Sequence, residues 1–131
     1  MIEKKYGFGK KFDFSYEEAI PKLKEALKAE GFGVLTEIDV KETLKAKLNI
    51  DFSKYIILGA CNPVLAHKAL QAEKEIGLLL PCNVIVYEDD DGKAVVLVFD
   101  PEVGMKMVDN PAVNDIAREA SEKLRRVIKS L

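Results

Sequence analysis

The chain has 131 residues and a mass of 14.6 kDa, a size at which one hydrophobic core is expected. Hydrophobic residues make up 48% and charged residues 32%, which excludes disordered and fibrous proteins. Lys and Arg number 20 and Asp and Glu 22, so the net charge of −2 gives no overall positive field to attract nucleic acid or an anionic membrane. We expect a single domain over residues 1–131, without a nucleic-acid or membrane partner.

The distribution of apolar residues and cysteines indicates where in the cell the protein is expected. The first five residues begin no apolar segment of the signal-peptide kind. No later stretch reaches the roughly 18 uncharged apolar residues that a membrane span needs. We therefore expect a cytoplasmic protein, in which Cys61 and Cys82 are free thiols because the compartment is reducing.

Strand and helix signals follow one another in the first quarter of the chain. Residues 6–14 alternate apolar and polar side chains, which predicts a strand with one buried face. Ser15 and Glu18 match a capping box, so a helix is expected to follow. Pro21 lacks an N–H, and it either distorts the first turns of this helix or delays its regular start. Gly31 is expected to end the helix in a left-handed conformation.

The middle of the chain repeats this alternation. Residues 32–38 predict a second strand, and residues 39–48 predict a short capped helix with an apolar stripe. Residues 55–61 are apolar at every position, which is typical of a central strand covered on both faces. The pair Asn62-Pro63 follows as the cap and first residue of a helix expected to extend to Gly77.

The last third predicts a hairpin and a long helix. Residues 78–82 are expected to form a buried connector. Residues 84–88 and 94–99 flank Asp91-Gly92, the strongest turn signal in the chain. Asn110-Pro111 opens a helix with a long apolar stripe. Together these elements predict an α+β fold, with about five strands in a mixed or antiparallel sheet and helices packed mainly on one face.

The junction between the strand at 55–61 and the next helix is the first candidate site. Cys61 would lie at a helix start, where free N–H groups and the helix dipole favour a thiolate or a bound anion. Cys61 would then be the most acidic thiol of the chain. Alternatively, Cys61 is a small buried hydrophobic residue, as free cysteine often is.

Metal and cofactor signatures are weak. Cys82 follows Pro81, and the intervening helix could return it to Cys61. With His67 these are the only soft metal ligands, and no close Cys-x-x-Cys pair is present, so we expect no metal. His67 falls outside the apolar stripe of its helix, toward solvent or an interface, which argues against a catalytic triad. The Gly-x-Gly at residues 7–9 lies inside a strand pattern, so we expect no dinucleotide cofactor.

Three segments of the chain carry a family resemblance. These are residues 31–35, 55–63 and 77–87, and Asp100-Pro101 with Met105 adds a fourth. They resemble the bacterial and archaeal family named domain of unknown function 302. The resemblance implies a compact α+β sheet protein that pairs with itself, and it implies no reaction. It also implies that one spatial feature is formed by Cys61, Asn62, Pro63, Pro81 and Cys82.

We therefore expect a non-enzymatic homodimeric binding protein that holds a small ligand near Asn62, where the helix start favours an anion. The alternative is a thiol enzyme or redox switch, with Cys61 as nucleophile and Cys82 as resolving thiol. Whether the protein is an enzyme stays open. Self-association is expected because neither proline nor a run of lysines protects the strand at 94–99. The interface would involve Val95–Leu97 or the outward side of the His67 helix.

Overall fold

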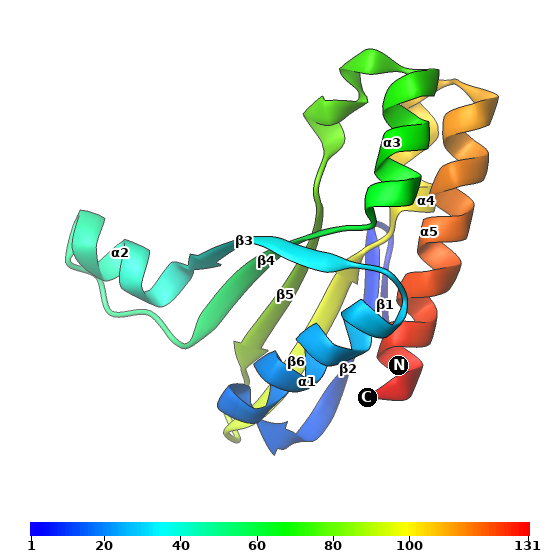
Figure 1. Ribbon diagram of the computed structural model, residues 1–131. Coiled ribbons are helices and arrows are strands. Elements are labelled where there is room, and N and C mark those ends of the chain that lie inside the picture. The colour runs from blue at the N-terminus through cyan, green and yellow to red at the C-terminus, as the bar shows by residue number, and fades with distance from the viewer.

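The computed structural model describes residues 1–131 and consists of a six-stranded antiparallel sheet with its long helices on one face (Figure 1). The strand order is β1-β2-β6-β5-β4-β3. This confirms the α+β prediction, with one strand more than expected because Ile2–Lys4 pairs with the strand that follows it. The strands are β1 (Ile2–Lys4), β2 (Gly7–Ser15), β3 (Gly33–Asp39), β4 (Tyr55–Cys61), β5 (Cys82–Glu88) and β6 (Lys93–Phe99). The helices are α1 (Tyr16–Ala29), α2 (Val40–Leu48), α3 (Pro63–Ala72), α4 (Pro101–Gly104) and α5 (Pro111–Ser130), with 3₁₀ helices at Lys74–Leu79 and Met105–Val108.

The main core lies between the sheet and the helices α1 and α5. Phe8, Val98, Val84 and Leu58 stand directly opposite one another across β2, β6, β5 and β4, and each is at most 1% exposed. Burying a side chain of this size stabilises the fold by about 1.5–3 kcal/mol. The helices cover this row with Leu23, Leu27, Leu124, Val127 and Ile128.

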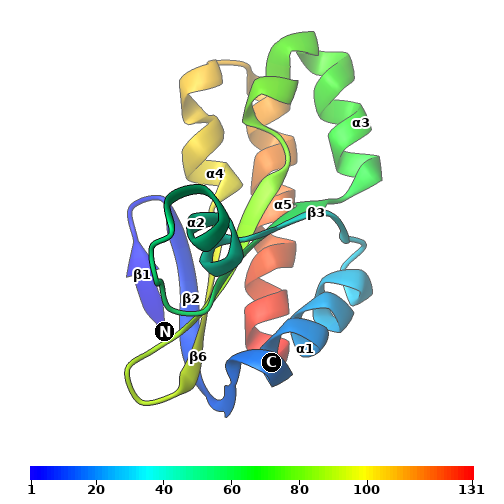
Figure 2. The ribbon, with the colours of Figure 1, turned by 90° about the vertical axis from the view of Figure 1, so that its left-hand side faces the viewer.

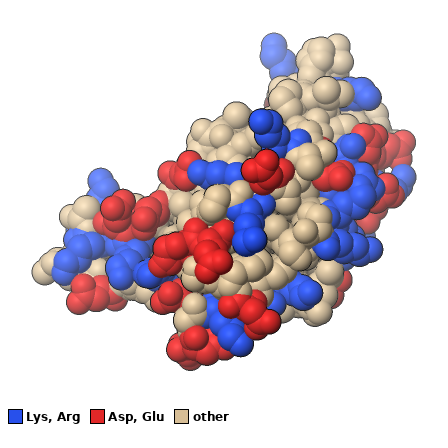
Figure 3. All heavy atoms as spheres, turned by 60° about the horizontal axis from the view of Figure 1, so that its bottom comes forward, with Lys and Arg blue, Asp and Glu red and all other residues tan.

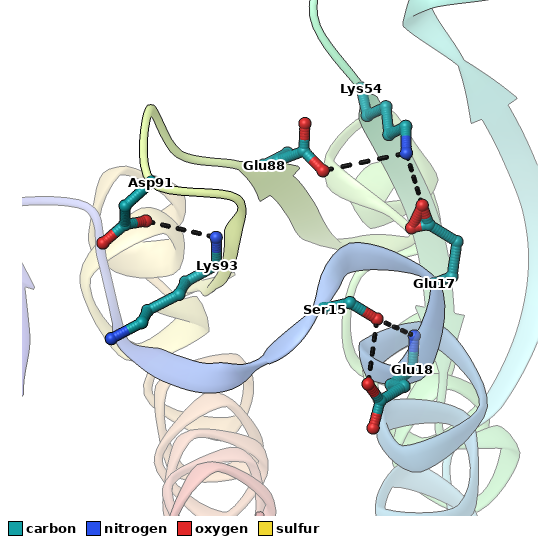
Figure 4. A network of polar contacts seen from close by, with 7 residues as sticks. All are labelled: Ser15, Glu17, Glu18, Lys54, Glu88, Asp91 and Lys93. Carbon is teal, nitrogen blue, oxygen red and sulfur yellow. Dashed lines mark hydrogen bonds and ion pairs between the residues drawn. The ribbon is translucent and has the colours of Figure 1, made fainter.

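The start and end of α1 agree with the local sequence signals. Ser15 Oγ accepts a hydrogen bond from the Glu18 N–H and donates one to Glu18 Oε1, both at 3.1 Å (Figure 4). The helix begins directly after this cap and continues through Pro21, so Pro21 does not delay its start. At the other end, Gly31 has a φ of +84°, and the Phe32 N–H bonds to the Leu27 carbonyl at 2.9 Å. This is the left-handed stop that the glycine predicts.

The opposite face of the sheet carries no helix packed flat against it. Residues 55–61 were expected to be covered on both faces, but Tyr55 and Ile57 of β4 are only half-buried. The helix nearest to them, α2, projects away from the sheet and has no buried residue (Figures 1 and 2). A uniformly apolar strand therefore has one covered and one open face here.

The segment that carries α2 is anchored at both ends. Asp39 caps α2 by accepting a hydrogen bond from the Glu42 N–H at 3.0 Å. At the far end, Lys54 pairs with Glu17 of α1 and lies 3.7 Å from Glu88 Oε2 of β5 (Figure 4). Because the ammonium of Lys54 donates to its carboxylate, the pKa of Glu17 lies below its usual range. These contacts tie the base of the α2 segment to the rest of the fold.

The region after α3 differs from the sequence prediction. The helix was expected to extend to Gly77, but α3 ends at Ala72 and a 3₁₀ helix replaces its last turn. Leu78, expected in a buried connector, is 88% exposed. The apolar stripe that suggested a longer helix is used instead by Ile76, which is buried against α5 and Met105.

The hairpin of β5 and β6 is present, with Gly92 at a φ of +79° in its turn. Its position in the sheet corrects an expectation, because β6 pairs with β2 on one side and β5 on the other. The strand at 94–99 is therefore internal, and the edges of the sheet are β1 and β3. At the tip of the hairpin, Lys11 of β2 lies 3.1 Å from Asp89 and 2.6 Å from Asp91.

The surface mixes charges of both signs. On the face shown in Figure 3, Lys and Arg side chains are interspersed with Asp and Glu, including on the projection formed by α2. None of the helices combines the length and apolarity needed to cross a membrane.

Candidate functional site

The structure brings the two cysteine-containing segments together. Cys61 is the last residue of β4, and Cys82 is the first residue of β5. Ala60 and Cys82 are register partners in these neighbouring strands, so the segments meet at one end of the sheet. Asn62 and Pro63 continue from β4 into α3, and Pro81 enters β5 through a cis peptide bond.

Asn62 links the start of α3 to the end of α1. Its Oδ1 accepts a hydrogen bond from the Leu65 N–H at 3.2 Å, which makes it the helix cap that its sequence position predicts. Its Nδ2 donates to the carbonyl of Glu30 at 3.4 Å. A Cβ on Gly31 would lie 3.0 Å from the same Nδ2, so a glycine there leaves room for the amide. Asn62 is 9% exposed and serves the fold directly.

The start of α3 offers few donors to an anion. Pro63 has no N–H, the Leu65 N–H is bound by Asn62, and the Ala66 N–H bonds to the Asn62 carbonyl at 2.8 Å. Of these three positions, Pro63 was part of the expected ligand site. The cap and the proline thus remove most of the first-turn donors that an anion would need.

A cavity lies between the ends of β4 and β5 and the helices α3 and α5. We call it the thiol cavity because Cys61 and Cys82 both line it. Its empty volume is about 490 Å³ including the part that is open to solvent, and about 50 Å³ of it admits the centre of a water molecule. Of its seventeen lining residues, fourteen are hydrophobic and none is charged. Asn62 and Pro81 also line it, whereas Pro63 does not.

The two thiols are free and protonated at neutral pH. Burial raises the pKa of Cys61 above its ordinary value. Burial also raises the pKa of Cys82 to about 11, and the nearby thiol of Cys61 adds to that shift. Burial therefore acts against the acidic thiol expected at Cys61. Loss of solvent in an apolar cavity is the cause for Cys61, and the Leu65 N–H of the nearby helix start is bound by Asn62.

His67 lies on the exposed side of α3 and does not join this site. No group of three His, Cys, Asp or Glu side chains is placed to hold a metal ion. Cys61 and Cys82 are thus the only His or Cys side chains that line the cavity.

Several lining residues escaped the sequence interpretation. They come from segments far along the chain: Ile76 from the 3₁₀ helix after α3, Met105 from the one after α4, and Val113 and Ala117 from α5. Ile76, Val113 and Ala117 belong to apolar stripes that indicate only burial, and Met105 was singled out only by the family resemblance. The small size of Ala69 in α3 and Ala117 in α5 was the one sequence signal for a cavity. These helices face each other, and alanines on facing helices leave space between them unfilled.

The fold and this site define a small α+β sheet protein with an apolar cavity at the ends of two adjacent strands. A family model described as Domain of unknown function DUF302 matches residues 8–131, and the chain belongs to that family. It is similar to a crystal structure of an uncharacterized conserved protein DUF302 from Bacillus stearothermophilus. The two are 31% identical, with a TM-score of 0.87, over 95% of this chain and 96% of that one. No curated protein matches this chain.

Proposed function

We propose that this protein is a non-enzymatic, homodimeric binding protein that holds a small apolar molecule, or the apolar end of a longer one, in the thiol cavity. The observation that carries this proposal is the lining, which is apolar, uncharged and contributed by five separate segments of the chain. Pockets for small molecules are mostly apolar with a few polar groups that set orientation. Here those groups are the Asn62 amide and the two thiols.

The size of the cavity limits its ligand. The 50 Å³ open to water centres is about a third of the roughly 150 Å³ of an apolar cavity known to hold benzene. A group of a few carbon atoms fits without movement of the lining. A longer molecule would extend through the open side of the cavity into solvent.

The lining favours an uncharged ligand over the anion expected from the helix start. The cavity has no Lys or Arg, and an anion placed there would lose its hydration without gaining a partner charge. Asn62 binds the Leu65 and Ala66 N–H groups at the start of α3, so few donors remain to compensate. We therefore place the ligand's apolar part, and not a phosphate or carboxylate, against Cys61 and Cys82.

The alternative of a thiol enzyme or redox switch has less support. Both thiols line one cavity, as a nucleophile and a resolving thiol would. However, nucleophilic thiols have a lowered pKa, and burial raises the pKa of both Cys61 and Cys82. A measured alkylation rate of Cys61 that levels off below pH 8 would favour the thiol enzyme instead.

Ligand binding can be tested with xenon as an apolar probe. Methyl NMR of the native protein should show xenon-dependent shifts at Met105 and Leu65, which line the cavity. The Ala66→Leu variant, which adds three carbons to a half-buried lining position, should lose these shifts. The matched control Ala112→Leu, on the exposed side of α5, should keep them.

Two results would contradict this proposal. One is a wild-type spectrum that xenon leaves unchanged. The other is inorganic phosphate shifting the amides of Val64 and Leu65 while xenon shifts nothing, which would move the ligand site to the helix start. Mass spectrometry of the natively purified protein would then identify any small molecule that remains bound.

A further inference from the structure

The open face of the sheet is an apolar surface that extends across the whole sheet. Ile38, Ile57, Ile85 and Leu97 stand directly opposite one another on β3, β4, β5 and β6. Directly opposite residues of an antiparallel pair point to the same face. All four are partly or largely exposed, in contrast to the Phe8–Leu58 row on the covered face. No charged residue interrupts this row from β3 to β6.

Aromatic side chains extend this surface toward α2. Tyr55 of β4 and Tyr87 of β5 are register partners, and their rings stack at a centroid distance of 5.7 Å. Phe52, just before β4, meets the Tyr55 ring edge-on at 6.3 Å. On the β2 side, Tyr6 borders a hollow on the same face and is 67% exposed.

Helix α2 stands in front of this face, and none of its residues is buried. Figure 2 looks onto the open face with α2 nearest the viewer and the sheet behind it. No residue of α2 is buried, although Val40, Leu44 and Leu48 form an apolar stripe along it. Leu48 is 61% exposed, and Ile50 in the following loop is 47% exposed. The fold thus leaves the far end of an amphipathic helix exposed, outside its own core.

We propose that a second copy of this chain binds to this open face and packs against α2. This rests on the homodimer in the proposed function and names its interface. The interface would be formed by residues 48–52 together with the exposed side chains of β3, β4, β5 and β6. Its reciprocal contacts would bury the parts of the α2 stripe that a single chain leaves exposed, above all Leu48.

The exposed area fits a dimer interface. The five most exposed apolar side chains here are Tyr6, Ile38, Leu48, Ile50 and Phe52, each between 41% and 67% exposed. At roughly 200 Å² for a fully exposed large apolar side chain, these five present roughly 530 Å², to which partly exposed members such as Ile57, Ile85 and Leu97 add. A standard stable interface removes about 800 Å² from each partner, whereas monomers rarely expose more than a few hundred Å² in one apolar patch.

A second copy of the chain would cover both parts of this surface, the open sheet face and helix α2. One chain supplies an apolar sheet face and a projecting apolar helix, and a twofold dimer uses the same patch of each chain in reciprocal contacts. An unrelated partner would have to supply complements to both. The His67 side of α3 offers no comparable area, because Leu70 and Val64 are isolated exposed apolar residues on that helix.

Light scattering after size exclusion, over a wide range of concentrations, tests this interface. The wild type should have twice the 14.6 kDa mass of one chain. Leu48→Glu on α2 and Ile57→Lys on the open face should each weaken dimerisation by at least roughly tenfold, because each buries an unpaired charge. Leu70→Glu, on the same side of α3 as His67, is the matched control and should remain dimeric.

The outcomes separate this inference from the proposals on which it rests. A wild type that stays near 14.6 kDa at every concentration overturns both the interface and the homodimer, while xenon binding remains a separate question. Dimers of both Leu48→Glu and Ile57→Lys would place the interface elsewhere and overturn this inference alone. Loss of the dimer only in Leu70→Glu would assign it to α3. If circular dichroism shows that Ile57→Lys does not fold, the Leu48→Glu variant alone tests the interface. Leu48 is exposed in the single chain, so this substitution should not prevent folding.

Discussion

The hydroxyl of Ser121 in α5 donates a hydrogen bond of 2.8 Å to Oδ1 of Asp100, at the end of β6. Both residues are buried, at 3% and 6% exposed. The same Oδ1 accepts the Glu102 N–H at 3.0 Å, and Arg125 Nη2 lies 3.6 Å from Oδ2. One carboxylate thus joins β6, the start of α4 and the middle of α5. Because α5 forms one wall of the thiol cavity, this contact also positions that wall.

Ser121→Ala should therefore destabilise the protein. The buried carboxylate of Asp100 would lose a donor, and hydrogen bonds to charged groups contribute about 1.5–3 kcal/mol. Urea unfolding measures the change in the free energy of unfolding. Ser53→Ala, in the exposed loop before β4, is the control and should stay within about 0.5 kcal/mol of the wild type. Equal losses in the two variants would show that the Ser121 hydrogen bond adds nothing to stability.

Asn62→Ala should cost about 1 kcal/mol, because a methyl group cannot accept the Leu65 N–H at the start of α3. Asn62→Asp keeps an acceptor oxygen and should lose less. Chemical denaturation of the three proteins gives the comparison. An unchanged midpoint with an unchanged m-value for Asn62→Ala would contradict the capping role.

Gly59 and Gly33 provide a matched pair in neighbouring strands. A Cβ on Gly59 would meet the Thr36 side chain and lie 2.8 Å from Cγ of Pro81, whereas a Cβ on Gly33 would meet nothing within 4 Å. Gly59→Ala should therefore destabilise the fold by about 1–3 kcal/mol through overpacking. Gly33→Ala should have little effect. Thermal melts of the two variants measure the difference, and similar melting temperatures would exclude a tight contact between Gly59 and Pro81.

The Cys82 thiol should make the folded protein less stable at alkaline pH. Burial raises its pKa from an ordinary value of 9.0 to about 11, so the folded protein holds the thiol proton more tightly than the unfolded chain does. This contribution to stability is complete below about pH 9 and is lost as the pH rises toward about 11.

Removing the thiol tests this dependence. Cys82→Ala lacks the titrating group, so its stability deficit relative to the wild type should shrink as the pH rises above 9. Urea unfolding of both proteins between pH 7 and about pH 11 provides the measurement. A constant difference over that range would mean that the Cys82 thiol has the same pKa in the folded and unfolded states.

Local signals in the sequence predicted the beginnings of helices well. Ser15, Asp39, Asn62 and Asn110 each cap the helix that their position predicts. The turns at Gly31 and Gly92 also adopt the positive φ that the sequence favours. These features involve contacts within a few residues, so they need no knowledge of the rest of the fold.

Element lengths and partners were less predictable. The stripe from Leu65 to Ile76 suggested one helix, but Ile76 is buried through a 3₁₀ helix against Met105 and α5. Residues 94–99 were expected to need protection as an edge, yet β2, distant in the sequence, covers them. Periodicity indicates that a side chain is buried and does not indicate which segment buries it.

By itself, the sequence determined the class of fold, the helix caps and, through its family resemblance, the grouping of Cys61, Asn62 and Cys82. Tertiary structure decided the chemistry of that group. The lining of α5 and Met105 makes the cavity apolar, and this raises the pKa of both thiols where a helix start alone would lower it. Tertiary structure also left Ile57 and Tyr55 on an open face, because α2 projects from the sheet instead of packing on it. Desolvation and coverage depend on all surrounding segments, and no local pattern specifies them.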